Sequence, residues 1–533
     1  MAEGHRAFVF GSETDVTRAP GGRDRRAVQV ATPSPTAPRR LRADQALAVT
    51  VVGGGLAGMA AAVSLAERGA KVTVREAGPV LGGRLSSWAD QLNEAANGAT
   101  IQMERGFHAF FRQYYNARAL LRRVDPSLDF LMACDDYPLF GPDHAFQSFA
   151  GLPRTPPLNL ATLVRRTPTL NLAGLRGMNG DAAAEMLAFD NDETYARFDS
   201  ISAKEYLDQV NFPPEARRML FEVFAHSFFN PEEAMSAGEM LMMFHLYFCG
   251  SGEGILFDVL TEPFGDAVWA PMRRHLERLG GTVVVNDDVE RLDEPGAGEA
   301  VVLATTVHSL QRIVAANPWL TDRFDGVGAA WAADLKALDQ APPFAVLRLW
   351  LDRDVNDDRA PFAGTAALGI LDNISCVHRY QGEARRWSMQ TGGSVVELHA
   401  YALPDTHHHD EARIRTELLA QLHAVYPETA AARILDERFV FRADCPSFAV
   451  GSYAHRLPVA TPHPRVKLAG DLVRLPFPTA LMERAVTSGF VAANELLTPF
   501  AVAAEPIWSV PTRGILASLQ AWQRRRMGAG KPL

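Results

Sequence analysis

The first regular pattern of apolar positions lies early in the chain. Val49-Thr50-Val51-Val52 is an apolar, β-branched run, which is typical of a buried parallel strand. A glycine-rich turn follows, and the alanine-rich residues 59–68 predict a slim helix that ends at Gly69. Residues 71–74 predict a second strand, which is followed by Glu76. Strand, turn, helix and strand in this order predict a parallel α/β unit.

The turn of this unit carries the spacing G-x-G-x-x-G, with Gly53, Gly55 and Gly58 at the three glycine positions. In dinucleotide-binding folds the first glycine permits a tight turn, the second lets the backbone approach a pyrophosphate, and the third lets the helix pack closely on the strand. The free N–H groups of the helix N-terminus would face the phosphates. Glu76 stands where a carboxylate accepts hydrogen bonds from a ribose. A glycine-rich turn in some other α/β unit would leave Glu76 unexplained, so we predict dinucleotide binding.

Two further segments favour FAD over a nicotinamide cofactor. Gly82-Gly83-Arg84 follows the second strand, and an arginine there can donate charge-assisted hydrogen bonds to a phosphate or to the flavin edge. Residues 466–471 predict a strand that ends in Gly470-Asp471, and residues 478–497 predict a helix after it. A second helix N-terminus beside an aspartate suits the ribityl and pyrophosphate part of FAD, because Asp471 can accept hydrogen bonds from hydroxyl groups.

Between these segments the pattern changes, which predicts that a second domain interrupts the first. Residues 118–260 are mainly helical in pattern, and residues 343–455 predict a mixed sheet. Strand patterns at residues 282–285 and 300–305 predict a return to the first domain. We therefore predict an α/β fold with a Rossmann-like FAD-binding domain and a discontinuous α+β substrate domain. The predicted parts are a flexible leader (1–45), the FAD-binding domain (46–105, 262–315 and 458–500), the substrate domain (106–261, mainly helical, and 316–457, mixed sheet) and a C-terminal tail (501–533).

Two patterns inside the predicted substrate domain bear on its core. Ser236-Ala237-Gly238-Glu239 has the spacing of a capping box and opens a helix through Phe248. This helix is apolar on nearly every side, which indicates either plain core or a surface that faces a lipid-like ligand. Residues 344–351, 395–401 and 439–442 alternate, which predicts strands of the mixed sheet.

Composition narrows the class of protein. The chain has 533 residues, a net charge of −9 and 47% hydrophobic residues, so we expect two or three domains and no nucleic-acid partner. Four scattered cysteines predict a reducing compartment and no iron–sulfur site. No uncharged apolar run reaches the roughly 18 residues of a membrane span, and there is no secretory signal peptide. His407-His408-His409-Asp410 lacks metal-ligand spacing and predicts a solvated loop.

The densest chemical cluster in the chain is residues 104–116, E-R-G-F-H-A-F-F-R-Q-Y-Y-N. One interpretation is a strand-to-helix junction that is packed by aromatic side chains and held by Glu–Arg pairs. The other places Glu104, Arg105 and His108 around the reactive face of a flavin, as catalytic residues. The aromatic side chains would then supply π faces in a dry pocket, and they are Phe107, Phe110, Phe111, Tyr114 and Tyr115.

The C-terminal tail predicts a second kind of surface. Ile515, Leu516, Leu519 and Trp522 fall on one helical face, and Arg524-Arg525-Arg526 follows them. Such a helix suits the interface of an anionic membrane. Packing of the same face onto the protein body is an equal alternative.

These motifs together resemble the flavin-dependent amine oxidase and phytoene desaturase superfamily, over about residues 48 to 498. Residues 231–305 resemble its plant-type carotene desaturase branch. The segment ERGFHAFFRQYYNARALLRRVDP, residues 104–126, resembles the carotene φ-ring synthases, or isorenieratene synthases, which turn a β-ionone ring into a trimethylphenyl ring. Residues 480–489 resemble the superfamily's helix over the flavin. Arg484 stands there where glycine is usual, which puts close backbone–flavin contact in question at this position.

The resemblance implies an FAD-dependent oxidoreductase that acts on CH–CH groups and converts the β-ionone rings of β-carotene to aromatic φ-rings, in isorenieratene biosynthesis. The proposed sequence of steps is hydride loss beside the ring alkene, migration of a geminal methyl group, and proton losses, with Glu104 or His108 as proton acceptor. The substrate would be a hydrophobic carotenoid, and we expect a cytoplasmic protein associated peripherally with the membrane. The terminal electron acceptor stays open, with a quinone or oxygen as candidates. The predicted cofactor-binding residues are Gly53, Gly55, Leu56, Ala57, Gly58, Glu76, Gly83, Arg84, Val289, Gly470, Asp471 and Met482.

The same resemblance suggests two alternative functions, and it raises the question of a second kind of cofactor. A desaturase of acyclic phytoene or ζ-carotene would use the same flavin without methyl migration, and its product would be a longer linear chromophore. A non-catalytic isoprenoid-binding protein of the GDP-dissociation-inhibitor type would have the fold without a working flavin site. Some relatives that modify carotenoid rings carry a Rieske-type centre, which the four isolated cysteines exclude here.

Overall fold

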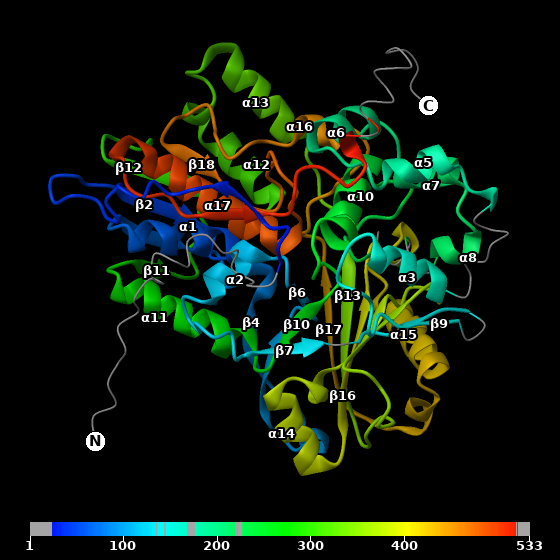
Figure 1. The fold of residues 1–533 in the computed structure, drawn as a ribbon. Coiled ribbons are helices and arrows are strands. Elements are labelled where there is room, and N and C mark those ends of the chain that lie inside the picture. Colours follow the sequence, from blue (N-terminus) through cyan, green and yellow to red (C-terminus); the bar gives the residue numbers. More distant parts are fainter. Residues whose placement is uncertain are drawn as a thin grey trace.

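The structure is a computed structural model that describes residues 24–134, 136–142, 145–167, 176–218, 221, 226–518 and 520. A five-stranded parallel sheet has the strand order β11-β3-β2-β12-β18. Three segments far apart in the sequence thus contribute strands to one sheet (Figure 1). The strands are β2 (Ala48–Val52), β3 (Lys71–Arg75), β11 (Thr282–Val284), β12 (Glu299–Leu303) and β18 (Val466–Leu468).

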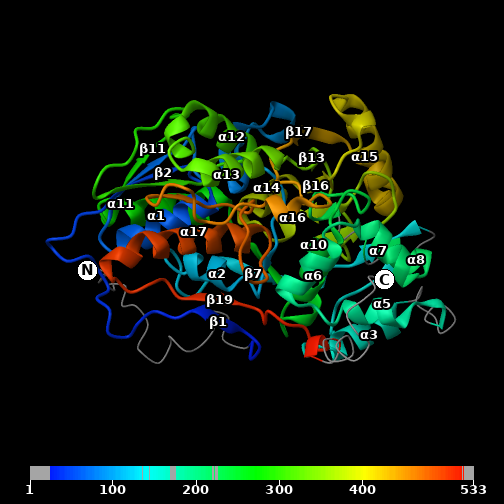
Figure 2. The same ribbon diagram turned by 90° about the horizontal axis from the view of Figure 1, so that it is seen from above.

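Two helices that flank this sheet pack against each other through small residues. They are α1 (Leu56–Glu67) and α17 (Leu481–Leu497), which begin three residues earlier and three residues later than the pattern predicted. A Cβ atom on Gly489 of α17 would lie 2.3 Å from the Ala57 carbonyl oxygen of α1. Glycine at this position therefore allows the backbones of the two helices to approach. On the other side of the sheet lie α12 (Val307–Ala316) and α13 (Asp325–Ala337), and α11 (Ala270–Arg278) leads into β11 (Figures 1 and 2).

The second domain is built on a seven-stranded mixed sheet of order β17-β13-β16-β15-β14-β8-β9. The inner strand β13 (Phe344–Leu351), which is second from the β17 edge, is buried along its whole length. One face of β13 packs under α15 (Glu411–Val425), and the other contributes to a core that includes Phe257 and Tyr380. Both faces of this strand are covered, so its alternation does not separate a buried face from an exposed one. The other strands are β8 (Leu139–Phe140), β9 (Phe146–Gln147), β14 (Phe362–Thr365), β15 (Asn373–Cys376), β16 (Ser394–Ala400) and β17 (Ile434–Arg442).

Smaller elements connect the two sheets. The hairpin of β4 (Ser87–Gln91) and β5 (Thr100–Glu104) leads into a three-stranded antiparallel sheet of order β6-β10-β7. Its strands are β6 (Phe110–Phe111), β7 (Leu131–Cys134) and β10 (Phe257–Leu260), which interrupt the mainly helical segment. Further α-helices within the described ranges are α2 (Tyr115–Leu121), α3 (Leu158–Arg166), α5 (Gly180–Glu185), α6 (Asn191–Phe198), α7 (Ala203–Val210), α8 (Pro214–Arg217), α10 (Ala237–Phe244), α14 (Gly382–Thr391) and α16 (Ser452–His455).

The predicted flexible leader contains a strand. Residues of β1 (Val28–Ala31) pair antiparallel with β19 (Ile507–Ser509), and the two strands lie side by side in Figure 2. Asp24, just before β1, accepts hydrogen bonds from the Tyr115 and Ser251 hydroxyl groups. The prediction failed over this part because the partner strand lies at the far end of the chain. In the predicted tail helix, Leu519, Trp522 and the arginines 524–526 lie outside the described residues.

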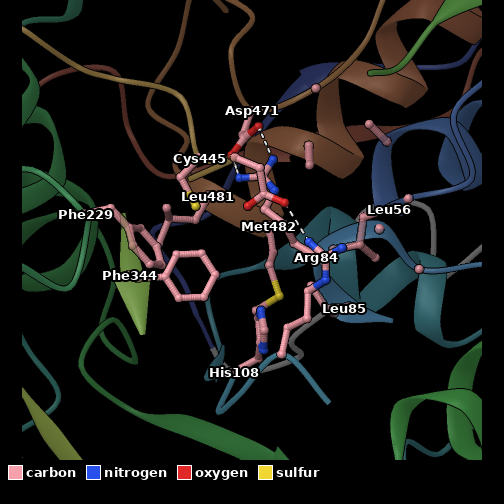
Figure 3. Close-up of a pocket in the computed structure, with 18 of the residues that line it drawn as sticks. Leu56, Arg84, Leu85, His108, Phe229, Phe344, Cys445, Asp471, Leu481 and Met482 are labelled. Carbon is pink, nitrogen blue, oxygen red and sulfur yellow. Dashed lines mark hydrogen bonds and ion pairs between the residues drawn. The ribbon is translucent and has the colours of Figure 1, made fainter. Parts of the chain in front are cut away.

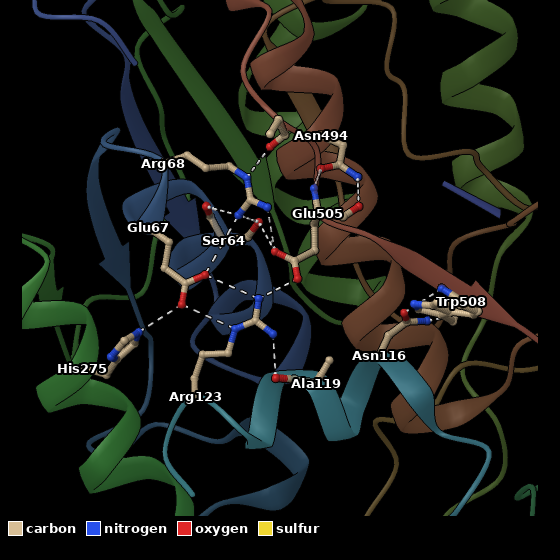
Figure 4. A network of polar contacts seen from close by, with 11 residues as sticks. Ser64, Glu67, Arg68, Asn116, Ala119, Arg123, His275, Asn494, Glu505 and Trp508 are labelled. Atoms are coloured by element: carbon tan, nitrogen blue, oxygen red, sulfur yellow. Dashed lines mark hydrogen bonds and ion pairs between the residues drawn. The ribbon is translucent and has the colours of Figure 1, made fainter. Parts of the chain in front are cut away.

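A buried ionic cluster joins the end of α1 to α2 and to the C-terminal segment (Figure 4). Arg123 donates to Glu505 at 2.6 Å and lies 3.4 Å from Glu67, while Arg68 lies 3.0 Å from Glu505. Burial alone would raise the pKa of the Glu67 carboxyl, but the cations around it, Arg123 above all, hold that pKa at about 2. His275 of α11 completes the cluster at 3.2 Å from Glu67. The cluster thus fixes α1, the helix whose N-terminus carries the G-x-G-x-x-G turn.

The histidine run at 407–409 is solvated only in part, since His408 is half-buried and His409 is exposed. His407 is buried, and its Nε2 lies 3.0 Å from Glu417 of α15. Asp410 caps α15 by accepting a hydrogen bond from the Arg413 N–H group at 3.0 Å. Among the described residues, none of the helices combines the length and apolar character needed to cross a membrane.

Candidate cofactor and substrate cavity

The glycine turn has the geometry that the G-x-G-x-x-G spacing predicts. Gly53 has a φ of +104°, and a Cβ on Gly58 would lie 1.9 Å from the Gly53 carbonyl oxygen. No larger residue fits at Gly58 without moving α1 away from β2. Glu76 accepts hydrogen bonds from the Gly54 and Gly78 N–H groups, each at 2.7 Å. The acid that was predicted to bind a ribose therefore also holds the turn in shape.

A second glycine strip faces the first. Gly82 and Gly83 both have positive φ values, +119° and +56°, and Gly55 forms a parallel bridge with Gly82. A Cβ on Gly83 would lie 3.4 Å from the Cα of Gly55. Backbone alone therefore lines both sides of this part of the cavity. Such a cradle of N–H groups at the start of α1 fits a pyrophosphate, which is the part of FAD that the fingerprint binds.

Arg84 and Asp471 meet across the cavity from segments far apart in the sequence. The guanidinium donates two hydrogen bonds to the carboxylate, at 2.6 and 2.7 Å (Figure 3). Burial works to lower the pKa of Arg84, but Asp471 outweighs it and the pKa lies well above its usual range. Gly470, with a φ of +147°, positions Asp471 beside the N-terminus of α17, where Met482 lies. This charged pair fits the polar ribityl chain of FAD, since both partners can exchange hydrogen bonds with hydroxyl groups.

These groups belong to one cavity of about 520 Å³ that continues from the glycine cradle into an aromatic region. Of the predicted cofactor-binding residues, Gly58 acts behind the surface and the others line the cavity: Gly53, Gly55, Leu56, Ala57, Glu76, Gly83, Arg84, Val289, Gly470, Asp471 and Met482. The aromatic region is formed in part by Phe107 stacked on Phe362 at 4.3 Å and Tyr137 stacked on Phe149 at 4.6 Å between ring centroids. This shape suits a cofactor at one end and a long apolar molecule at the other.

The predicted aromatic lining is partly correct. Phe107, Phe111 and Tyr114 line the cavity, whereas Phe110 and Tyr115 are buried and are not among the described residues that line it. Both of these rings belong to the hydrophobic core instead. The apolar helix around α10 continues as a π-helical turn, His245–Cys249. Its Tyr247 and Phe248 line the cavity, so this helix belongs to the core and also reaches the ligand space.

The three predicted catalytic residues occupy different layers. Glu104 ends β5 and is buried, but it is not among the described residues that line the cavity. It accepts hydrogen bonds from the Phe264 N–H group at 2.8 Å and from the Gln381 side chain at 2.9 Å, and Arg348 lies 3.5 Å away. Burial raises the pKa of Glu104 to about 7, although Arg348 opposes this shift. This carboxylate thus lies one layer behind the cavity.

Arg105 and His108 do line the cavity. Arg105 forms an ion pair with Asp444 at 2.6 Å, and His108 Nδ1 lies 2.9 Å from the Gly106 carbonyl oxygen. Burial lowers the pKa of His108 to about 4, so its imidazole is neutral near pH 7. In Figure 3 His108 lies beside Met482, on the side of the cavity where the predicted flavin-binding helix begins. The structure therefore brings Arg105 and His108 together and sets Glu104 apart from them.

Polar residues of β16 and of the position after it form part of the site that the sequence reasoning missed. Glu397, His399 and Tyr401 occupy alternate positions, so they share one face of the chain. Glu397 lies 2.8 Å from His399 Nε2, and the Tyr401 hydroxyl lies 2.7 Å from His399 Nδ1. His399 and Tyr401 line the cavity. The signal was present in the pattern E-L-H-A-Y, where polar side chains alternate with apolar ones on a predicted strand.

The Arg484 side chain points away from the cavity and does not block it. Its guanidinium donates to Glu239 at 2.6 Å and to the Thr479 carbonyl oxygen, also at 2.6 Å. Glu239 binds Arg456 and the Tyr195 hydroxyl as well, so its carboxylate is not used in the predicted capping box. Ser236 still accepts a hydrogen bond from the Glu239 N–H group, at 3.4 Å, so half of the box is formed. The large side chain at this position therefore does not occupy the cofactor's side of α17.

The geometry agrees with comparisons to known proteins. The family model described as flavin containing amine oxidoreductase matches residues 56–497. The chain is 48% identical to a carotenoid phi-ring synthase of Streptomyces griseus, over 94% of this chain and 96% of that protein. It is 27% identical to a carotenoid phi-ring synthase of Chlorobaculum tepidum, over 88% and 91%. A 15-cis-phytoene desaturase of Arabidopsis thaliana is 24% identical over 66% of this chain and 65% of that protein.

Solved structures show the same fold at low identity. A putrescine oxidase with a redesigned cofactor-binding site has a TM-score of 0.59 and 17% identity, and the match covers 85% of this chain and 100% of that one. The family match and this fold support FAD as the cofactor of the glycine cradle.

Proposed function

The chain belongs to the flavin-containing amine oxidoreductase family, and we propose that it is a carotenoid φ-ring synthase that aromatises the β-ionone rings of β-carotene. The single observation that carries the proposal from the structure is the continuity of the cavity. A backbone cradle that fits FAD opens directly into an apolar region with aromatic walls. The near full-length similarity to two proteins named phi-ring synthases favours ring chemistry over acyclic desaturation.

The chemistry requires that each ring lose two hydrides and two protons, while one methyl group moves from the geminal carbon to its neighbour. FAD, when bound, supplies the hydride acceptor for carbon atoms that carry no polar group. The glycine cradle, Arg84 and Asp471 would hold it. The apolar walls exclude water, which would otherwise capture a carbocation. Aromatic faces such as those of Phe107 and Phe362 stabilise positive charge on the ring that reacts.

Proton transfer falls to groups that touch the cavity. His108 is neutral near pH 7, so it can accept a proton at its free ring nitrogen, Nε2, without first losing one. Glu104 stands behind the cavity wall, so we assign it a positioning role through Arg348 in place of direct proton transfer. Arg105 is paired with Asp444 and thus adds no uncompensated positive charge beside a cationic ring.

Expression of the protein in cells that make β-carotene tests this proposal. We expect pigments that lack four hydrogen atoms per converted ring and show aromatic methyl signals by NMR. A matched strain that accumulates ζ-carotene serves as control, and there we expect no change of the linear chromophore. A longer linear chromophore in that strain, with unchanged β-carotene in the first, would establish the acyclic desaturase instead. A purified protein without flavin absorbance and without product would indicate isoprenoid binding.

We also propose peripheral association with an anionic membrane from the cytoplasmic side, where the substrate dissolves in lipid. The segment up to Ala517 is tied to the body, because Gly514 and Leu516 donate to the carbonyl oxygens of Phe189 and Leu187 at 2.6 and 2.9 Å. Truncation after Ala517 leaves these bonds in place. It should reduce co-sedimentation with vesicles rich in phosphatidylglycerol while bound flavin stays constant. Equal sedimentation of the truncated and full-length proteins would contradict membrane binding by the tail.

A further inference from the structure

We propose that Tyr401, His399 and Glu397 form a proton relay in which the Tyr401 hydroxyl takes a proton from the reacting ring. This inference rests on the proposed function and names a further catalytic residue for it. The Tyr401 oxygen lies 2.7 Å from His399 Nδ1, and His399 Nε2 lies 2.8 Å from the Glu397 carboxylate. Tyr401 and His399 line the cavity, and Glu397 is fully buried behind them. The order from cavity to interior is hydroxyl, imidazole, carboxylate.

The charges of the buried groups determine which atom donates and which accepts in each hydrogen bond of the relay. Arg348 donates to Glu397 at 2.7 Å. Burial would raise the pKa of Glu397, but Arg348 and the contact with His399 hold it at about 2, so the group is a carboxylate. A carboxylate only accepts, so His399 Nε2 carries a proton and donates it. Nδ1 is then the acceptor, and the Tyr401 hydroxyl donates to it. The Phe107 N–H group also points at Nε2, at 3.4 Å, but the contact of Nε2 with the charged Glu397 carboxylate is shorter, at 2.8 Å, and decides the tautomer.

The Tyr401 oxygen is held in place from a second side. The Asn373 side chain donates to it at 3.2 Å, and Asn373 also lines the cavity. A phenol oxygen that donates one hydrogen bond and accepts another is fixed in position and still presents electron density to a third group. Gly106 allows His399 to approach the loop that carries His108, because a Cβ on Gly106 would lie 2.7 Å from His399 Cε1. The relay and His108 therefore serve the same end of the cavity.

The relay step balances without any additional reagent. After hydride loss, a ring cation breaks a C–H bond and keeps the electron pair as a new ring double bond. The proton moves to the Tyr401 oxygen while the hydroxyl's own proton moves to His399 Nδ1. His399 becomes an imidazolium ion that pairs with the Glu397 carboxylate, so the site holds one extra proton and the substrate has lost its charge. The proton returns to water after the product leaves.

The same groups explain why the proton is lost after the hydride. Burial raises the pKa of Tyr401 far above its usual range, so the residue stays a neutral phenol. A neutral phenol cannot remove a proton from a neutral hydrocarbon, whereas a carbocation is acidic enough to protonate it as the proton is passed on. The relay therefore acts only once the cation exists. Arg348, which also lies 3.5 Å from Glu104, is a positioning residue that holds Glu397 in its charged form.

Tyr401→Phe tests the relay because it keeps the ring and removes the hydroxyl. We expect flavin content and KM to stay near the wild-type values, while turnover per flavin-loaded enzyme falls by roughly 10²–10⁴-fold and partly oxidised, non-aromatic rings accumulate. His399→Gln should give the same products, and the double variant should be no slower than the single ones, since the groups act as a unit. Tyr206→Phe is the control, because its buried hydroxyl donates to the Ala182 carbonyl at 2.7 Å, away from the cavity.

Wild-type turnover with fully aromatic product from Tyr401→Phe would overturn the relay. If His399→Gln loses its flavin, Tyr401→Phe decides alone. Multiplied losses in the double variant would also contradict a single relay, because independent roles add in free energy. Failure of the proposed function gives a different result from failure of the relay. In that case the wild-type protein itself would make no aromatic product from β-carotene in the same cells. In that case the relay assignment falls with it.

Discussion

Replacing Glu76 with alanine should weaken FAD binding and loosen the glycine turn at the same time. Its two carboxylate oxygens accept the Gly54 and Gly78 N–H groups, each at 2.7 Å, in a half-buried setting. In the predicted binding mode the same carboxylate accepts hydrogen bonds from the ribose. Losing such an acceptor costs on the order of 1–3 kcal/mol once the remaining polar groups are partly rehydrated. The expected increase in the Kd for FAD is therefore about 5- to 150-fold.

The assay is titration of the apoprotein with FAD, followed by quenching of flavin fluorescence. Glu76→Gln is the matched variant, because it keeps one carbonyl acceptor and the side-chain volume, so its affinity should lie between those of the wild type and Glu76→Ala. Thermal unfolding of the apoproteins measures how much of the effect is loss of the turn. A wild-type Kd in Glu76→Ala would refute the ribose assignment. If only the stability of the apoprotein falls, Glu76 is a brace for the turn.

Three further predictions concern the cofactor cradle, the buried ionic cluster and the predicted catalytic cluster. Gly58→Ala should abolish flavin binding, because the new Cβ would lie 1.9 Å from the Gly53 carbonyl oxygen. The control is Gly180→Ala, which has open space around it and should retain flavin. Equal flavin content in the two variants would contradict the close packing at Gly58. The Glu67 carboxylate has a folded pKa of about 2 against an ordinary value of 4.5, so its stabilising effect is complete above about pH 5 and is lost as pH falls from 4.5 towards 2. Unfolding midpoints of wild type and Glu67→Gln should thus converge at low pH, and a constant difference would exclude this linkage. Glu104→Gln should retain flavin and should lower turnover less than His108→Gln does. The turnover of His108→Gln should fall by roughly 10²-fold or more. The opposite order of single-turnover rates would indicate that Glu104 is the proton acceptor.

The elements around the fingerprint could be predicted because their signals are local. Apolar strands, glycine spacing and the position of Glu76 all fall within about thirty residues, and each reports on its own neighbours. The return of the chain to the same sheet was also visible, because β12 contains a short apolar run and β18 leads into Gly470-Asp471. By contrast, β1 pairs with β19, which lies near the opposite end of the chain. No local pattern encodes such a partner.

The site was harder to predict than the fold because burial depends on distant segments. Glu104 stands in a cluster of chemically active residues, but its partners Phe264, Arg348 and Gln381 come from later parts of the chain. They enclose the carboxylate and separate it from the cavity. The relay on β16 was missed for a related reason: the alternation predicted a strand but not which distant segments cover its two faces. The polar face, which includes His399, faces the cavity.

The charges around the cavity are arranged in a way that suits a cationic reaction. Arg84 pairs with Asp471, Arg105 with Asp444, and Arg348 with Glu397, so each of these cations is neutralised by a carboxylate close to it. One oxygen of Asp444 is buried and has no hydrogen-bond partner within the described part of the chain. Asp444 lines the cavity, but together with Arg105 it forms a neutral pair. No net positive charge of these pairs therefore repels a cationic ring at the moment of hydride loss, and the neutral His108 and Tyr401 can then remove protons without repelling it.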